Sequence, residues 1–151
     1  MKELSDLNSL TRKAKSQFAK YFHHDPSVIA QAPGRINILG EHVDYTGGFA
    51  LPMAINKWII TALRPSTDTH SRIFSTNIQT EFSFDARSPI APVIKGKEKF
   101  ANHAIGVIEG LRRIQPITQQ YEILIHGDIP IGAGLSSSAA LEISLIRAFS
   151  E

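Results

Sequence analysis

Hydrophobic residues near the start of the chain recur at the spacing of an α-helix. Between residues 4 and 22 they fall three or four positions apart, which places them on one helical face, with charged residues elsewhere. The pattern predicts an amphipathic helix that ends before Asp25–Pro26 and packs on the core of its own domain. The apolar face is formed by Leu4, Leu7, Leu10, Ala14, Phe18, Tyr21 and Phe22.

Beyond this helix the spacing changes to the short apolar runs that are typical of β-strands. Pro33–Gly34 separates the first two runs, and a polar turn near Asn77 separates two weaker ones. The segment 88–96 contains two prolines and is expected to be a loop. The predicted strands cover 28–32, 36–39 and 58–63 and, more weakly, 72–75 and 81–84.

The rest of the chain alternates helical and extended patterns. Helical spacing predicts a helix over 97–114. At 121–126 apolar and polar residues alternate, which predicts a strand with one buried face. A loop at 127–134 and a last helix at about 137–149 follow. Because no repeat or linker interrupts the pattern, residues 1–151 are expected to form one α+β domain.

The last predicted helix carries apolar side chains on nearly every side. A terminal helix of a complete small domain usually keeps a broad polar face, so these side chains need a cover. Exposed apolar patches above about a few hundred Å² rarely persist on soluble monomers. We therefore expect a homodimer or larger species whose interface includes Leu141, Leu145 and Phe149. The alternative is that the local sheet absorbs the same side chains.

The amino-acid composition excludes several functional classes of protein. The chain has 16 Lys and Arg against 14 Asp and Glu, a net charge of +2, and its cations are scattered, so no nucleic-acid partner is expected. The absence of cysteine excludes disulfides, zinc–thiolate sites and cysteine nucleophiles, and it fits a reducing cytosol. No apolar run approaches the roughly 20 residues that span a bilayer, and no signal-peptide pattern is present. We expect a cytoplasmic protein with no membrane partner.

The first candidate for chemistry is the segment between strand 121–126 and the last helix. Its sequence is His126-Gly-Asp-Ile-Pro-Ile-Gly-Ala-Gly-Leu-Ser-Ser-Ser-Ala-Ala140. Gly132 and Gly134 allow the backbone to come close to a ligand, and the serines open a helix whose N–H groups and dipole attract an anion. This is a phosphate-binding pattern, although it matches neither the Rossmann fingerprint nor the Walker loop. The alternative is that Ser136 to Ser138 only cap a buried helix.

The second candidate is the polar cluster of Arg35-Ile-Asn-Ile-Leu-Gly-Glu-His-Val-Asp-Tyr-Thr-Gly-Gly48. Carboxylates accept hydrogen bonds from vicinal hydroxyls and a neutral imidazole both donates and accepts, so Glu41, His42 and Asp44 suit a polyol. Arg35 is close enough in sequence to reach the same pocket and to stabilise charge on a transferring phosphoryl group. A metal site and a turn whose carboxylates face water are the alternatives.

These two segments resemble a known kinase family. Gly34 to Tyr45, together with Gly48 to Ile55, is similar to the galactokinase signature. Pro130 to Ala140 is similar to the second motif of the wider galactokinase, homoserine kinase, mevalonate kinase and phosphomevalonate kinase superfamily. Ile38–Leu39 and Val43 depart from the usual signature without touching its charged residues. The resemblance implies a ribosomal-protein-like N-terminal domain with a mixed sheet and packed helices.

The resemblance also implies roles for individual residues. Arg35 would stabilise the transition state, and Glu41, His42 and Asp44 would bind galactose hydroxyls. ATP and Mg²⁺ would be the cofactors, Ser138 would be a Mg²⁺ ligand, and the products would be galactose 1-phosphate and ADP. Phe100 and His103 would lie near adenine. For Phe100, packing in the core is an alternative that we expect at least equally. The ATP-binding set would be Gly132, Ala133, Gly134, Leu135, Ser136, Ser137 and Ser138.

The same resemblance implies that the C-terminal domain of the family is absent. In galactokinases the catalytic Asp, a Mg²⁺-binding Glu and a third glycine-rich motif follow the second motif, whereas this sequence ends at Glu151. A truncated chain, a natural fragment and a decayed relative remain open, and the missing half is a possible partner. Turnover by this chain alone is expected to be absent or very small. A non-catalytic galactose and ATP sensor or interaction module is the alternative function, whereas a mevalonate-type kinase would have no use for the trio at 41, 42 and 44.

Overall fold

The computed structural model describes residues 3–40 and 47–151 and confirms the α+β class. Helices flank a set of strands that range from 5 to 16 residues in length. In chain order the elements are α1 (Glu3–Phe22), β1 (Val28–Leu39), β2 (Leu51–Ser66), β3 (Ser71–Ser75), β4 (Thr80–Phe84), the 3-10 helix η2 (Lys97–Phe100), α2 (Ala101–Arg112), β5 (Gln120–Gly127) and α3 (Ser137–Ser150).

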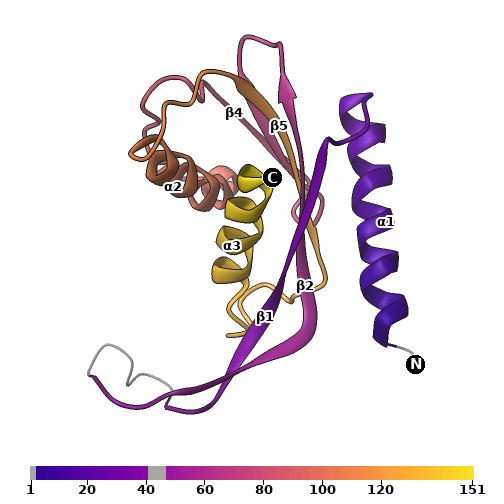
Figure 1. Ribbon diagram of the computed structural model, residues 1–151, viewed down its shortest axis with the longest axis vertical. Helices are drawn as coiled ribbons and strands as arrows, with labels where there is room; N and C mark the ends of the chain where they lie inside the picture. Colours follow the sequence, from indigo (N-terminus) through magenta and orange to yellow (C-terminus); the bar gives the residue numbers. More distant parts are fainter. Residues whose placement is uncertain (1–2, 41–46) are drawn as a thin grey trace.

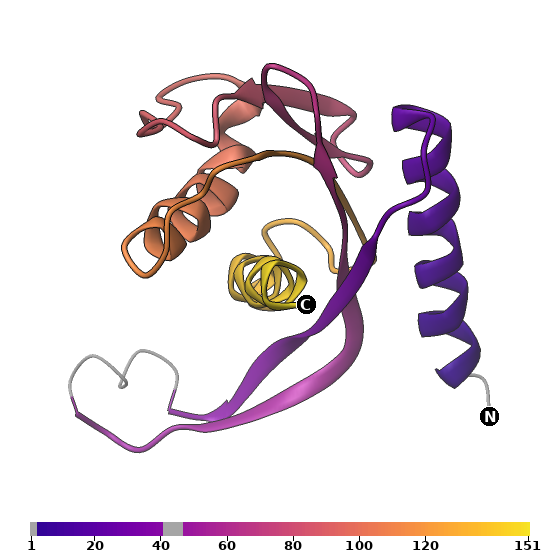
Figure 2. The ribbon, with the colours of Figure 1, turned by 45° about the horizontal axis from the view of Figure 1, so that its top comes forward.

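The strands form one mixed sheet in the order β1-β2-β5-β3-β4. Neighbouring strands are antiparallel, except that β3 and β5 are parallel. Helix α1 covers one face of the sheet, whereas α2 and α3 cover the other (Figure 1). Figure 2 shows that β1 and β2 continue beyond the other strands as a two-stranded ribbon. The sheet is therefore the middle of three layers, and the prediction of a mixed sheet with packed helices is confirmed.

Helix α1 packs on the sheet through the face that its sequence predicts. Phe18 has no exposed surface and Phe22 is 2% exposed. The ring of Tyr21 stacks on Phe74 of β3 with their centroids 3.9 Å apart. The helix ends at Phe22, before Asp25–Pro26, as predicted.

Both faces of β5 are buried, so the prediction of one buried face is wrong. Ile123 and Ile125 belong to the core beneath α2 and α3, whereas Leu124 belongs to the core beneath α1. Glu122 is also buried, and its Oε1 lies 3.1 Å from Nη2 of Arg72. An acidic residue in an alternating pattern therefore indicates a solvent-exposed strand face only if no cationic side chain pairs with it in the fold.

Two predicted boundaries differ from the structure in the ribbon. Pro33–Gly34 does not divide the strand, because β1 runs from Val28 to Leu39 with an irregular register between Pro33 and Arg35. Proline is tolerated there because β1 is an edge strand. Strand β2 begins at Leu51 rather than at 58, because its pairing with β1 continues along the ribbon.

The predicted helix over 97–114 is divided into two elements. The chain enters through the 3-10 turn η2 after Gly96, whose φ of 87° lies in the left-handed region. The regular helix α2 begins only at Ala101 and ends at Arg112.

The α3 residues expected at an interface pack within the chain, which corrects that prediction, whereas Ile143 and Ile146 of the same helix are 51% and 41% exposed. Leu145 has no exposed surface, Leu141 is 9% exposed, and the ring of Phe149 packs edge-on against Tyr121 with centroids 4.9 Å apart. Leu141 and Leu145 are therefore not available to a second copy, and the oligomeric state stays a prediction. None of the helices within residues 3–40 and 47–151 has the length and apolar character that a membrane span needs.

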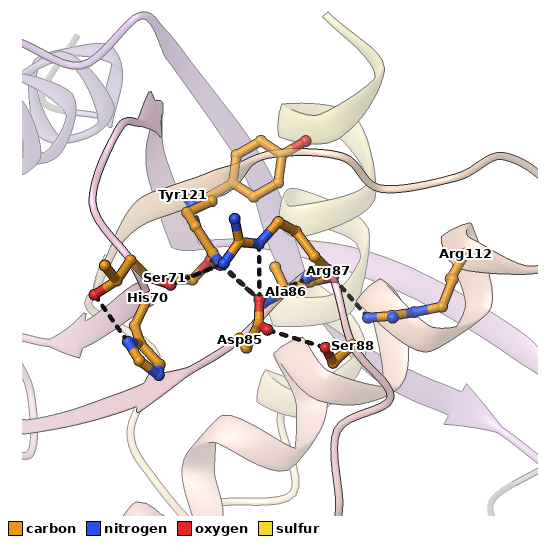
Figure 3. A network of polar contacts seen from close by, with 10 residues as sticks. His70, Ser71, Asp85, Ala86, Arg87, Ser88, Arg112 and Tyr121 are labelled. Atoms are coloured by element: carbon orange, nitrogen blue, oxygen red, sulfur yellow. Dashed lines mark hydrogen bonds and ion pairs between the residues drawn. The ribbon is translucent and has the colours of Figure 1, made fainter.

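A network of hydrogen bonds among polar side chains lies at the end of the sheet where β5 begins (Figure 3). Gln120 is 2% exposed, and its Oε1 accepts hydrogen bonds from the Ser71 hydroxyl (2.7 Å) and the Ala86 N–H (2.9 Å). Its Nε2 donates to the Thr69 carbonyl (2.9 Å) and to Oδ1 of Asp85 (2.6 Å). Every hydrogen-bonding position of this buried amide is thus satisfied.

Asp85 is the anionic centre of the same network. The Gln120 amide, the Arg87 backbone N–H and the Ser88 hydroxyl all donate to its carboxylate, and they hold the pKa of Asp85 well below its usual range. Arg112 of α2 donates from Nη2 to the Ala86 carbonyl at 2.7 Å (Figure 3). The network therefore ties α2 to the ends of β3, β4 and β5.

Candidate functional site

The glycine- and serine-rich loop after β5 has the backbone of an anion cradle. Gly132 and Gly134 have φ values of 75° and 70°, which glycine adopts without strain. A Cβ at either position would meet no atom within 4 Å, so the space above the loop is open. Ser136 also has a positive φ, 55°, which is uncommon for a residue with a side chain. Strain of this kind gathers at functional sites.

The start of α3 is left available to a ligand. Ser136 is the residue before the first helical turn, and its side chain makes no capping hydrogen bond. The explanation that Ser136 merely caps the helix therefore fails for this residue. Free N–H groups and the helix dipole favour an anion at such an end.

The entrance of the loop is fixed by residues that the sequence did not single out. Asn77, in the turn between β3 and β4, donates from Nδ2 to the Gly127 carbonyl (2.8 Å) and accepts the Gly127 N–H at Oδ1 (3.1 Å). Asp128 accepts the Trp58 N–H (2.7 Å) and pairs with Nζ of Lys57 (3.0 Å). The only sequence signal was the polar turn near Asn77, and it did not reveal which strand the turn would contact.

The exit of the loop meets the strand that carries the second motif. The backbone N–H of Arg35 donates to the carbonyl of Leu135 at 3.1 Å. The structure thus brings together Arg35 and the loop 132–138, which were separate candidates in the sequence. Glu41, His42 and Asp44 lie outside the described residues.

Two hollows flank Ser136 to Ser138. The first, which we call the Arg35 pocket, has a volume of about 350 Å³, and the second, the Phe100 pocket, has a volume of about 210 Å³. The Arg35 pocket is lined by Ala32, Pro33, Gly34, Arg35, Pro52, Ala54, Ser136, Ala139, Ala140 and Ile143. The Phe100 pocket is lined by Ile59, Ser75, Asn77, Ile78, Phe100, His103, Ile125, Ile129, Ile131, Ser137, Ser138 and Leu141.

The two pockets differ in chemistry. Arg35 lines its pocket beside the start of α3, and none of the lining residues within the described part of the chain is acidic. The Phe100 pocket has an aliphatic floor and two rings, Phe100 and His103, which suits a flat apolar group. Phe100 also packs against the main core, and Nδ1 of His103 lies 2.9 Å from Oε1 of Glu142 on α3. An anion over Ser136 to Ser138 would therefore lie between a cationic hollow and an apolar one.

The fit of the implied cofactors can be tested on these residues. Positive φ angles, open space and an uncapped helix end fit a row of phosphate oxygens. The described residues contain no group of three or more His, Asp or Glu that could hold a metal ion. Ser138 would contribute a hydroxyl ligand to a Mg²⁺ ion, and phosphate oxygens and waters are further ligands that such an ion usually takes.

His126 precedes the loop but lines neither pocket. Its Nδ1 lies 2.7 Å from the Thr76 hydroxyl, and its buried Nε2 has no hydrogen-bond partner within the described residues. Burial and the positive charge of Lys13 lower the pKa of His126. The ring is therefore neutral near pH 7 and belongs to the packing of β5.

Comparisons with known proteins agree with both motifs. Residues 16–65 match the family model described as the galactokinase galactose-binding signature, and residues 102–151 match the GHMP kinases N terminal domain. A galactokinase from Chloroflexus aurantiacus is 39% identical over 85% of this chain and 32% of its own length. A galactokinase from Roseiflexus is 36% identical over 92% of this chain and 34% of its own length. The chain thus spans about a third of the curated relatives it matches.

Solved structures agree on the fold. The galactokinase of Lactococcus lactis, solved in complex with galactose, superimposes with a TM-score of 0.69 at 32% identity, covering 96% of this chain and 38% of that one. The mevalonate kinase of Methanococcus jannaschii gives the same TM-score at 24% identity, covering 82% of this chain and 39% of that one. The similarity to the mevalonate kinase, at 24% identity, supports a shared fold and nothing further.

Proposed function

Because this chain belongs to the galactokinase family of the GHMP kinases and corresponds to its N-terminal part, we propose that it supplies the sugar-binding strand and the phosphate-binding loop of an ATP-dependent galactokinase. The observation that carries the proposal is the hydrogen bond from the Arg35 N–H to the Leu135 carbonyl. It joins the strand of the galactose signature to the loop that fits phosphate. A kinase needs this juxtaposition, because acceptor and phosphoryl donor must meet.

The two pockets suggest how the substrates are oriented. The adenine ring would occupy the Phe100 pocket, and the phosphates would lie over residues 132 to 138, where free N–H groups and the α3 dipole stabilise their charge. The hydroxyls of the sugar would be bound by Glu41, His42 and Asp44. The products would be galactose 1-phosphate and ADP.

Arg35 is assigned the electrostatic role. Arg35 is exposed and lines the Arg35 pocket together with Ser136. A guanidinium there would neutralise charge that spreads over the equatorial oxygens of the transferring phosphoryl group. Mg²⁺, when bound with the nucleotide, would supply further neutralisation of the phosphates, with the Ser138 hydroxyl as one ligand.

The polypeptide of 151 residues is expected to bind substrates better than it turns them over. No acidic residue lines the Arg35 pocket among the described residues, so no carboxylate there would accept the proton of the sugar hydroxyl. The same feature favours the second candidate, a galactose and ATP sensor without catalysis. The two candidates differ in turnover, not in binding.

Calorimetry with Mg·ATP and with galactose tests the proposal. Arg35→Gln should weaken Mg·ATP binding by about 1–3 kcal/mol, the usual loss for a charge-assisted hydrogen bond. Arg113→Gln, at an exposed arginine at the end of α2, is the matched control and should leave the affinity unchanged. Glu41→Ala or Asp44→Ala should weaken galactose binding by about 1–3 kcal/mol.

Three outcomes would count against parts of this proposal. Absence of any Mg·ATP binding by the wild-type chain would refute a complete phosphate site in these residues. Galactose affinity that is unchanged in both carboxylate variants would favour a turn whose carboxylates face water. Coupled ADP release at robust, saturable rates would show that this chain alone has a general base, and it would exclude the sensor.

A further inference from the structure

The register between β1 and β2 breaks at one glycine. Pro33 pairs with Trp58, and Arg35 pairs with Ala54, so β1 advances by two residues while β2 moves by four. Gly34 lies between the two pairs. Directly after this break the N–H of Arg35 donates to the Leu135 carbonyl of the phosphate loop. The irregularity therefore lies where the strand meets the loop.

Gly34 is required there for space rather than for backbone conformation. Its φ is not among the positive values, so any residue could adopt its backbone. A Cβ at this position would nevertheless lie 2.9 Å from the Leu135 carbonyl oxygen, closer than real Cβ atoms approach other atoms. It would also lie 3.0 Å from Cδ1 of Ile129 and 3.3 Å from Cδ1 of Ile55. The nearest obstacle is backbone, which cannot rotate away as a side chain can.

We propose that Gly34 is a positioning residue that sets the separation between the Arg35 guanidinium and the phosphate loop. The catalytic consequence rests on the proposed function, whereas the contact itself does not. Leu135 precedes Ser136, whose left-handed backbone leads into the first turn of α3. A methyl group at residue 34 would therefore displace both the strand and the N–H groups that face the phosphates.

The magnitude follows from the tolerance of phosphoryl transfer. The Leu135 carbonyl oxygen would have to retreat by about 0.5 Å, from 2.9 Å to the 3.4 Å at which ordinary van der Waals contact begins. The hydrogen bond to the Arg35 N–H, now 3.1 Å long, would lengthen or tilt with it. Catalytic groups must be held within about half an ångström of the productive geometry, so this shift is large enough to matter.

Amide hydrogen exchange of the chain tests the contact without any ligand. In the wild-type chain the Arg35 amide should be protected, and in Gly34→Ala it should exchange at least about tenfold faster, because the opening of this contact is then less costly. Gly106→Ala is the matched control, since Gly106 has an ordinary φ and nothing lies within 4 Å of its Cβ position. That variant should leave the Arg35 amide unchanged.

A double variant separates loop positioning from side-chain packing. Ile129→Val removes the methyl group that a new Cβ would touch, but it leaves the Leu135 carbonyl in place. Gly34→Ala with Ile129→Val should regain part of the lost stability while the Arg35 amide stays unprotected. Full recovery of protection in the double variant would overturn the proposal and assign the effect to packing.

Titration with Mg·ATP, followed by the fluorescence of the single tryptophan, adds the functional readout. The backbone of Trp58 is hydrogen bonded to Asp128 at the entrance of the loop, whereas its indole Nε1 donates to Asn56, so the fluorophore senses loop movement through the backbone of its own residue. Gly34→Ala should bind Mg·ATP more weakly than wild type and Gly106→Ala equally well. If no variant binds Mg·ATP but the exchange result holds, the proposed function fails and the positioning contact stands. An Arg35 amide as protected in Gly34→Ala as in wild type overturns the inference.

Discussion

Replacement of Gln120 by leucine tests the polar network at the start of β5. Leucine has nearly the shape of glutamine, so the change removes hydrogen-bonding groups without opening a large cavity. The Ser71 hydroxyl and the Ala86 N–H lose their acceptor, and neither residue has exposed surface through which water could replace it. The Thr69 carbonyl and the Asp85 carboxylate also lose a donor, but both residues reach solvent.

The expected loss follows from the two buried donors. An unsatisfied buried hydrogen-bonding group costs about 1–3 kcal/mol. Burial of the more apolar leucine offsets part of this sum. We expect Gln120→Leu to lower the free energy of unfolding by about 2–4 kcal/mol.

Urea denaturation, followed by far-ultraviolet circular dichroism and by Trp58 fluorescence, measures the change. Gln119→Leu is the matched control, because the neighbouring glutamine is exposed and, among the described residues, its side chain makes only a 3.4 Å hydrogen bond to the Tyr121 hydroxyl. It should change stability by no more than about 0.5 kcal/mol. Equal effects of the two substitutions would refute the idea that the buried amide holds this edge of the fold.

Gln120→Glu gives the same network a pH test. The new carboxylate would face Oδ1 of Asp85, which now lies 2.6 Å from the glutamine amide. Repulsion would raise the pKa of the introduced group in the folded state, so the loss of stability is present at neutral pH and disappears as pH falls through that pKa. A deficit that does not shrink between pH 7 and pH 4 would contradict the geometry.

Three further predictions concern other ionisable groups. Because burial lowers the pKa of His126, unfolding takes up a proton as pH falls below the ordinary histidine value of about 6.5, and His126→Gln should remove part of the stability loss between pH 7 and pH 5 in urea titrations. Arg72→Met should destabilise by about 1–3 kcal/mol in the same assay, because the carboxylate of Glu122 would stay buried without its partner. Burial and the adjacent Glu81 raise the pKa of Tyr21 to about 12, so the last phenolate step in an alkaline absorbance titration should vanish in Tyr21→Phe.

Exposed residues provide the controls for these predictions. His24→Gln and Arg113→Met change exposed side chains and should leave stability within about 0.5 kcal/mol of wild type. A wild-type pH dependence that persists in His126→Gln, or an Arg72→Met variant as stable as the Arg113→Met control, would contradict the respective prediction.

The sequence predicts a helix or strand well where its buried residues recur at a single regular spacing. Helix α1 is correct to within a few residues because its apolar positions recur at helical spacing. The outer part of β2 was missed for the opposite reason. Leu51 and Met53 are 52% and 46% exposed, and the segment from 51 to 57 has no buried residue. It is held as a strand by pairing with β1, which leaves no burial pattern to detect.

The site was predictable only where its chemistry is local. Glycines and serines at 132 to 138 signal an anion loop by themselves, because positive φ angles and a helix start depend on neighbouring residues. The contacts of Asn77 and Asp128 depend on which strands lie side by side. No spacing within the sequence reveals that order.

The meeting of the two motifs follows from the order of the sheet. Strand β5 pairs with β2 rather than with β1, so the loop after β5 leaves the sheet one strand away from Arg35. Helix α3 then runs back beneath β1 and β2, which brings the end of the loop to the irregular register of β1 (Figure 1). A glycine within a strand usually weakens it. At position 34 the missing side chain is what allows the strand and loop to touch, because a Cβ there would lie 2.9 Å from the Leu135 carbonyl oxygen. Gly34→Ala should therefore lower both the stability of the fold and the protection of the Arg35 amide, although alanine is the better strand residue in isolation.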